Sequence, residues 1–227
     1  MISHNLLWRL WSFGGDRRFR RVAYSQEGED LILDRIFARK RSGFYVDVGA
    51  HHPHRYSNTF LFYLRGWRGI NVDPLPGTKA LFDKLRPRDI NLELAVLRDR
   101  RCATYFEFND PAVNGFDAHL VNSRESQGRY RLLRTTERAA LPLREILATY
   151  LPIGTVIDFL SVDVEGMDLE VLESNDWERY RPRVVLAEIR GSSLSSITSD
   201  PVHVFMRNQG YDLFAKSMQT VFFVRED

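Results

Sequence analysis

The sequence has few groups that could cross-link the chain or anchor it in a membrane. Cys102 is the only cysteine among the 227 residues, which excludes an intrachain disulfide and a cysteine-based metal site. A single cysteine also fits a reducing compartment. No stretch approaches the roughly 20 apolar residues of a membrane span, so no transmembrane segment is expected. The chain must therefore be held together by a hydrophobic core.

An excess of charge of either sign is also missing. The sequence has 32 Lys and Arg against 30 Asp and Glu, a formal net charge of +2. Bulk electrostatics therefore give no reason to expect a nucleic-acid partner. Arginines are nevertheless dense in residues 17–21 and 124–138. We interpret both clusters as solvated faces, with contact to an anionic substrate, a phosphorylated carrier or a membrane surface as the alternative.

The first residues contain no run suited to secretion. Arg9 interrupts their apolar patch, so a cytoplasmic location is expected. Leu6, Leu7, Leu10 and Trp11 fit one face of a short amphipathic helix. That face would dock on the domain or on a partner subunit, which leaves a homo-oligomer open. Residues 1–40 are accordingly expected to form an N-terminal helical extension.

Apolar runs that suit buried strands alternate with helical patterns along the chain. Strands are predicted at 44–48, 68–74, 90–97, 103–108, 156–164, 183–189, 211–215 and 220–224, and helices at 25–39, 57–64, 78–85, 142–150, 167–174 and 201–209. The alternation predicts one α/β domain over 1–227, with a parallel sheet and a closing hairpin. Residues 109–137 lack periodicity and are expected to be an acceptor-site loop or lid.

Carboxylates stand at the ends of successive predicted strands. They are Asp47, Asp73, and Asp163 with Glu165. Ligands of open α/β sheets bind outside the carboxyl ends of the strands, so these side chains should converge. Asp73 lies a little over 20 residues past the glycine turn, where a ribose diol is held. The turn is D-x-G-A and lacks the G-x-G-x-x-G of dinucleotide folds. This disfavours a nucleotide-dependent oxidoreductase and favours an adenosine ligand such as S-adenosylmethionine.

Four stretches resemble the FkbM family of S-adenosylmethionine-dependent methyltransferases. They are YSQEGEDLIL (24–33), FYVDVGAHHP (44–53), SNTFLFYLRGWRGINVDPLPG (57–77) and DFLSVDVEGMDLEVLES (158–174). The resemblance implies a Rossmann-like class I fold. This fold has a mostly parallel seven-stranded sheet with an antiparallel last strand. It also implies methyl transfer to oxygen. Many relatives have a lysine before the D-x-E-G acids, whereas this chain has Ser161 there.

The resemblance also implies roles for individual residues. Asp47, Gly49 and Ala50 should line the methionine and ribose portions of the cofactor, and Asp73 should hold the ribose hydroxyls. The remaining cofactor candidates are Ala95 with Val96 beside the adenine, and Gln26, Ser57 or Asn58, and Asp163 toward the methionyl end.

Methyl transfer to a hydroxyl needs a group that removes the acceptor's proton. Our first hypothesis makes Glu165 or Asp163 the base, while the other orients cofactor or acceptor. His51 and His52 are second candidates, and surface or capping roles are equally open for them. In a metal-dependent alternative, Asp163, Glu165 and Glu188 bind Mg²⁺, although Glu188 could simply pair with Arg190.

The leading functional prediction is O-methylation of a hydroxyl on a sugar, glycan or related metabolite. A natural-product hydroxyl, such as that of a polyketide, is the closest alternative acceptor. A non-catalytic Rossmann-type module that binds partners is the alternative from another class. The intact acids at Asp47, Asp73, Asp163 and Glu165 argue against it.

Overall fold

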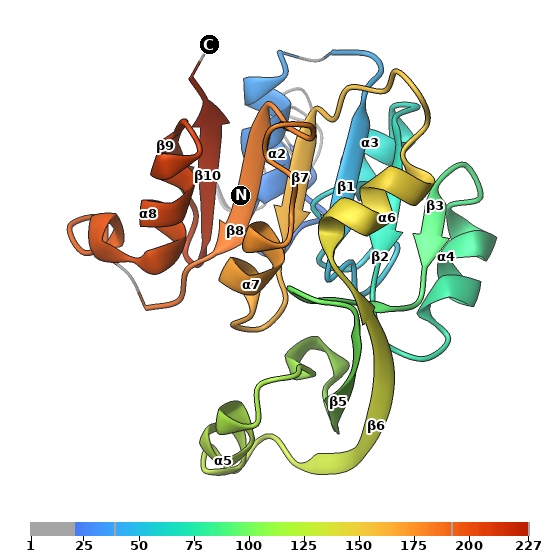
Figure 1. Ribbon diagram of the computed structural model, residues 1–227, viewed down its shortest axis with the longest axis vertical. Coiled ribbons are helices and arrows are strands. Elements are labelled where there is room, and N and C mark those ends of the chain that lie inside the picture. Colours follow the sequence, from blue (N-terminus) through green and yellow to red (C-terminus); the bar gives the residue numbers. More distant parts are fainter. Residues whose placement is uncertain (1–20, 39, 192, 227) are drawn as a thin grey trace, which may run out of the picture.

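The structure, a computed structural model, describes residues 21–38, 40–191 and 193–226. Its main feature is a seven-stranded sheet of order β3-β2-β1-β7-β8-β10-β9 (Figure 1). Its strands are β1 (Phe44–Val48), β2 (Arg68–Val72), β3 (Ile90–Leu92), β7 (Phe159–Val162), β8 (Val184–Glu188), β9 (Tyr211–Lys216) and β10 (Thr220–Arg225). Neighbours pair in parallel except for β10, which is antiparallel to β8 and β9. The predicted mostly parallel sheet with an antiparallel last strand is confirmed.

Helices cover both faces of this sheet (Figure 1). On one face, α2 (Glu29–Ile36) and α3 (Phe60–Leu64) contribute Leu33 and Phe62 to a core that includes Tyr45 of β1. On the other face, α6 (Leu143–Tyr150), α7 (Asp168–Glu173) and α8 (Pro201–Asn208) pack over Val46 and Val48, and η3 (Ile197–Ser199) precedes α8. The helix α4 (Thr78–Leu85) contacts β3 at the sheet edge. Because β1 is buried on both faces, its run is apolar rather than alternating.

The first described helix is shorter than predicted. α2 begins at Glu29 after Gly28, whose φ of 87° is left-handed, rather than at Ser25. The Ser25 hydroxyl donates to Asp30 Oδ1 at 2.8 Å and so closes a loop. At the other end, the helix ends at Ile36, and Ala38 has a φ of 45°, which a right-handed helix does not allow. The predicted amphipathic face at residues 6–11 lies outside the described residues.

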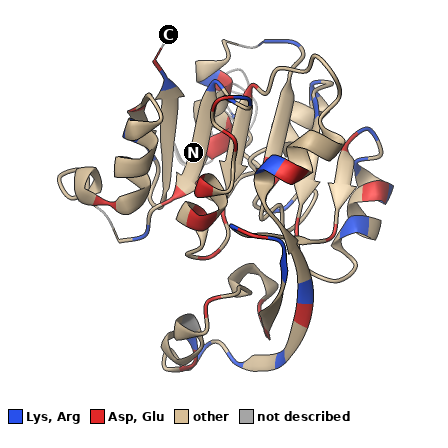
Figure 2. Cartoon of the chain, viewed as in Figure 1, with Lys and Arg blue, Asp and Glu red and all other residues tan. Residues whose placement is uncertain are grey.

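A second sheet projects beyond the carboxyl ends of the main strands (Figure 1). Its order is β4-β6-β5, with β4 (Ala95–Val96), β5 (Arg101–Phe108) and β6 (Leu132–Leu141). Between β5 and β6 the chain forms η2 (Pro111–Val113) and α5 (His119–Glu125). We call residues 95–141 the lobe. Figure 2 marks residues of both charge signs in this part of the chain.

Two predictions about this part of the chain were wrong. The predicted strand at 90–97 is two strands in two sheets, because β3 pairs with β2 whereas β4 pairs with β6. Between them, the Glu93 carboxylate accepts the Gly77 N–H at 2.8 Å, which ties this connection to the start of α4. Residues 109–137, expected to be irregular, contain α5 and the first half of β6. Within the described residues, no helix is long and apolar enough to cross a bilayer.

Candidate functional site

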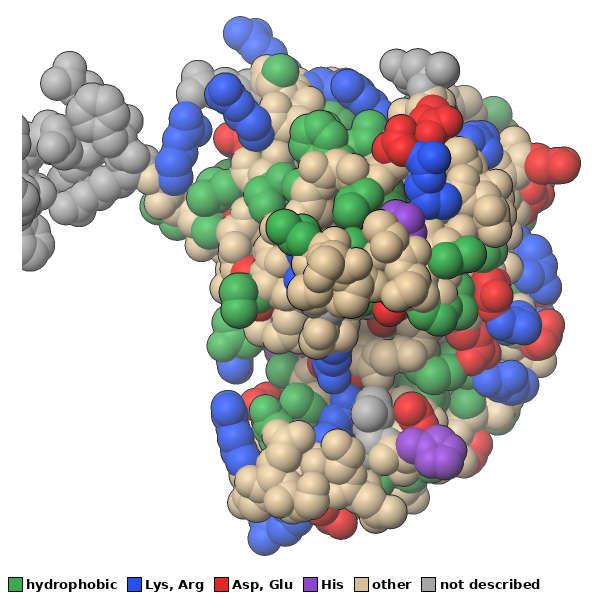
Figure 3. Space-filling model, turned by 90° about the vertical axis from the view of Figure 1, so that its left-hand side faces the viewer, with side chains coloured by type: hydrophobic (Ala, Val, Ile, Leu, Met, Phe, Trp, Pro, Cys, Tyr) green, Lys and Arg blue, Asp and Glu red, His purple; other side chains and the backbone are tan. Residues whose placement is uncertain are grey.

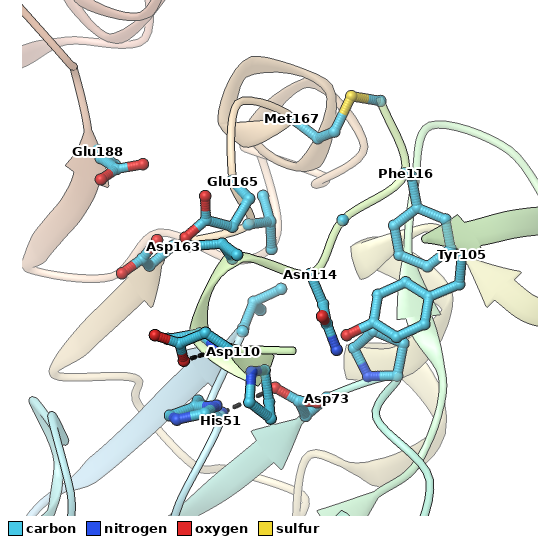
Figure 4. Close-up of a pocket in the computed structure, with 18 of the residues that line it drawn as sticks. His51, Asp73, Tyr105, Asp110, Asn114, Phe116, Asp163, Glu165, Met167 and Glu188 are labelled. Carbon is cyan, nitrogen blue, oxygen red and sulfur yellow. Dashed lines mark hydrogen bonds between the residues drawn. The ribbon is translucent and has the colours of Figure 1, made fainter. Parts of the chain in front are cut away.

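A cavity of about 640 Å³ lies between the carboxyl ends of the main strands and the lobe. Figure 3 shows the surface hollowed between body and lobe, and Figure 4 shows part of the lining. The main sheet contributes the loops that follow β1, β2, β7 and β8, and the lobe contributes residues between 105 and 130. Its volume suits a small-molecule ligand of nucleoside size together with a second small molecule.

Gly49 brings the ends of β1 and β7 together at the cavity floor. Its φ is +83°, and a Cβ at this position would lie 1.8 Å from the carbonyl oxygen of Asp163. The Gly49 N–H donates to the carbonyl of Val72 at 2.9 Å. Only glycine fits a turn that is both left-handed and this crowded. The turn therefore sets Asp163 against the first strand.

Asp73 is held by backbone groups at the end of β2. Its carboxylate accepts the N–H of His51 at 2.7 Å (Figure 4) and that of Leu75 at 2.8 Å. His51 has a φ of 50°, a left-handed conformation that is costly for a residue with a Cβ. Burial raises the pKa of Asp73 to about 6, against the lowering effect of these hydrogen bonds. Each carboxylate oxygen keeps a further lone pair that could accept a hydroxyl donor.

An apolar wall faces Asp73 from the lobe. The rings of Tyr105 and Phe116 have their centroids 4.9 Å apart, and Figure 4 shows them on one side of Asp73. Ala95 and Leu97 also line the cavity and belong to the same small core as Phe116. An aromatic wall with a carboxylate beside it suits a purine nucleoside.

Acidic side chains gather at the opposite end of the cavity (Figure 4). Asp163 is exposed on the cavity wall. The surrounding protein, and then the charges of Glu188, Asp168 and Glu165, raise its pKa well above the usual value. Behind it, Asp168 accepts the N–H of Glu188 at 2.9 Å, and burial raises the pKa of Asp168 to about 7. A carboxyl with an elevated pKa is a stronger base than an ordinary aspartate.

Two arginines form ion pairs with the carboxylates beside Asp163. Glu165 pairs with Arg124 of the lobe at 2.7 Å and also with Arg190, and Arg190 pairs with Glu188 at 2.7 Å. Glu165 has a φ of 58°, so its backbone is strained beside the cavity. Among the residues that the structure describes, no group of three or more His, Cys, Asp and Glu side chains is placed to hold a metal ion. The predicted Mg²⁺ ligands Glu165 and Glu188 face arginines instead.

The predicted cofactor and catalytic residues divide into two sets. Those that line the cavity are Gln26, Gly49, Asp73, Ala95, Val96, Asp163 and Glu165, together with the alternatives His51 and Glu188. Asp47, Ala50, Ser57, Asn58 and His52 are absent from its lining. Asp47 accepts the Thr59 hydroxyl at 2.8 Å beneath β1, and Nδ1 of His52 accepts the N–H groups of His54 and Arg55.

Sequence reasoning missed the buried side chain that supports the loop after β1. Arg86 is fully buried and donates to the carbonyl of Pro53, to the hydroxyl of Ser57 at 2.7 Å and to that of Thr59 at 2.8 Å. No local pattern distinguishes this arginine from its exposed neighbours. Tyr105 and Phe116 were also missed, because they belong to an added strand and an irregular segment whose placement over the sheet is a tertiary feature.

Comparison with known proteins gives one family match. A family model described as "Methyltransferase FkbM domain" matches residues 47–213, well over half of the chain. No curated protein matches. One solved structure, described as a TehB-like SAM-dependent methyltransferase from Corynebacterium glutamicum ATCC 13032 Kitasato, is 12% identical. That match covers 98% of this chain and 96% of that chain at a TM-score of 0.40.

Proposed function

Because the chain belongs to the FkbM methyltransferase family, and is therefore a methyltransferase, we propose that it transfers the methyl group of S-adenosylmethionine to a hydroxyl of a sugar, glycan or related metabolite. One observation carries the proposal. A single cavity contains an apolar wall of Tyr105 and Phe116 beside Asp73 and, at its other end, an exposed carboxyl of raised pKa, Asp163.

The residues at the cavity floor fit this cofactor. The close turn at Gly49 leaves the backbone of β1 bare, so that a ligand can approach it directly. Asp73 has lone pairs left for the two ribose hydroxyls, and Ala95 with Val96 would border the adenine. Gln26 and Asp163 would receive the methionyl end. No loop built to hold a pyrophosphate is needed for this ligand.

Polar side chains contribute to the lining of the cavity, which supports a polyhydroxylated acceptor. Ser123, Gln127 and Tyr130 line it from the lobe, and Gln26 and Gln219 line it from the main domain. Hydroxyl and amide groups of this kind donate and accept hydrogen bonds, as sugar recognition requires. A largely apolar natural product would leave these groups unpaired at a cost. The lobe would thus supply much of the acceptor site.

Asp163 is the residue that we assign as general base. When bound, the cofactor supplies an electrophilic methyl group on sulfur. The acceptor oxygen forms the new bond to that methyl group as the bond to sulfur breaks, and the Asp163 carboxylate takes the hydroxyl proton. Glu165 is less suited to this task, because two arginines hold its Oε2. Its role would be to position Arg124 and Arg190 at the cavity edge.

Methyl transfer from labelled S-adenosylmethionine to a panel of sugars, sugar phosphates and nucleotide sugars tests this proposal. The expected product is a methyl ether, identified by mass spectrometry, whose formation slows about a hundredfold with Asp163→Asn. Transfer to none of these acceptors, but efficient transfer to polyketide hydroxyls, would overturn the assignment of a sugar acceptor.

A further inference from the structure

Two cavity arginines remain without a carboxylate partner. Among the described residues, four arginines line the cavity, of which Arg124 and Arg190 are paired with Glu165 and Glu188. For Arg55 and Arg129, no carboxylate of a described residue lies within ion-pair distance, and both side chains are exposed. The sequence pattern alone favoured solvated faces for the arginines around 124–138. Their position at the cavity changes this interpretation for Arg129.

Each of these arginines is stacked on the tyrosine that follows it. The Arg55 guanidinium lies 4.5 Å from the ring centroid of Tyr56, and that of Arg129 lies 5.2 Å from Tyr130. Both tyrosines also line the cavity. Stacking restricts a guanidinium to one plane, which reduces the ordering needed to bind an anion through two parallel N–H groups. Two such pairs, one from the main domain and one from the lobe, thus share one opening.

Their location associates them with the acceptor rather than with the nucleoside. The backbone carbonyl of Arg129 accepts the side-chain amide of Asn109 at 3.2 Å, next to Asp110. Arg55 is close enough to His51 to help lower the pKa of that imidazole, after burial and the charge of His52. Figure 4 shows Asp110 and His51 on the side of Asp73 away from Tyr105 and Phe116. Both neighbours of these arginines thus lie on the side of Asp73 away from the aromatic wall, and we assign this side to the acceptor.

We propose that the acceptor is an anionic sugar, whose phosphate or carboxylate is held between Arg55 and Arg129 while a hydroxyl of the same molecule reaches Asp163. This inference rests on the proposed function and narrows its substrate class. A guanidinium matches the planar face of a carboxylate and the edge of a phosphate, and both are bound with charge-assisted hydrogen bonds. The two arginines would hold the anionic group of the sugar, which is remote from the reacting hydroxyl. Binding energy at that remote group would orient the hydroxyl for reaction.

A matched control exists on the outside of the molecule. Arg179 stacks on Tyr180 at 5.0 Å in a third Arg-Tyr pair, and its side chain is exposed. It is absent from the cavity lining. Arg179→Gln therefore removes the same charge and the same stacking contact at a position where no acceptor binds.

The test is a set of titrations of the protein saturated with S-adenosylhomocysteine, whose own binding is recorded first. The probes are glucose 6-phosphate, glucuronate, glucose and inorganic phosphate. We expect at least one anionic sugar to bind about tenfold more tightly than glucose, and R55Q/R129Q to abolish this preference while R179Q preserves it. Binding of phosphate alone as tightly as the sugar phosphate would reduce the site to an adventitious anion site. That outcome would overturn the proposal.

Equal binding of glucose and the anions, no anionic sugar bound at about 10 mM, or equal losses in R179Q and R55Q/R129Q would also overturn it. A failure of the proposed function is distinguishable, because it appears as absent S-adenosylhomocysteine binding in the first titration.

Discussion

Replacing Asp73 with alanine is expected to weaken nucleoside binding about a hundredfold. The carboxylate is 6% exposed at the cavity wall, and its two oxygens already accept the His51 and Leu75 N–H groups. Two ribose hydroxyls would add two charge-assisted hydrogen bonds, each worth about 1.5 kcal/mol at the lower end of their range. Their sum of about 3 kcal/mol corresponds to roughly a hundredfold in Kd.

The same contact predicts a pH dependence with a definite sign. Burial raises the pKa of Asp73 to about 6 in the free protein. Ribose hydroxyls donate more strongly to the charged form, so binding lowers that pKa and releases protons where the free carboxyl is protonated. Affinity should therefore be full above pH 7 and should fall as the pH drops through 6. At pH 5 only about a tenth of the free carboxyls are ionised, which predicts a loss of up to roughly tenfold.

Competition calorimetry with adenosine and 2′,3′-dideoxyadenosine separates this contact from damage to the loop. Alanine also leaves the N–H groups of His51 and Leu75 without their acceptor. Any resulting disorder weakens both ligands equally, whereas loss of the ribose contact weakens adenosine alone. The preference for adenosine should vanish in Asp73→Ala and shrink in the wild type at pH 5. Equal losses for both ligands, or a preference unchanged between pH 5 and 7.5, would refute the reasoning.

Three other changes test separate parts of the account. Asp163→Asn should lower the methyl-transfer rate about a hundredfold. Because a base must be unprotonated, the wild-type rate should rise with pH through the raised pKa of Asp163. If the rate of Asp163→Asn still rises with pH in the same range, Asp163 is not the base. Gly49→Ala should abolish S-adenosylhomocysteine binding, because its Cβ would meet the carbonyl of Asp163. Gly154→Ala has a similar φ of +76° but no atom within 4 Å of the added Cβ, so this variant should bind normally. Equal binding by the two variants would contradict a role for the close contact at Gly49. Arg86→Met should lower the free energy of unfolding in urea by about 3–5 kcal/mol, because it leaves buried acceptors unpaired. The control is Arg88→Met, since Arg88 donates a hydrogen bond to the carbonyl of Tyr63. A loss of stability in Arg86→Met no larger than that in the control would contradict this prediction.

The main sheet was predictable because its strands are long buried runs. Phe44–Val48 and Phe159–Val162 are mostly apolar and are buried on both faces, and between them further strand runs alternate with helical patterns. The lobe was not predictable to the same degree. β6 is mostly exposed, and its threonines and arginines carry no apolar alternation. Its pairing with β5 joins segments about thirty residues apart, which local patterns do not encode.

Some residues of the site were likewise predictable from the sequence, and others were not. Asp73 and Asp163 could be predicted as site residues because they stand at strand ends, and both line the same cavity in the structure. Asp47 follows the same rule but faces the opposite side of β1, where Thr59 holds it, because successive strand residues alternate in direction. The pairing of Glu165 with Arg124 depends on how the lobe folds back, and no spacing in the sequence indicates it.

The central claim is that this cavity binds the nucleoside of a methyl donor, and calorimetry with S-adenosylhomocysteine tests it most directly. We predict one site per chain with a Kd of the order of micromolar. Binding should be lost in Gly49→Ala and retained in Gly154→Ala. Absence of any heat of binding at millimolar ligand, from protein shown to be folded, would contradict the account.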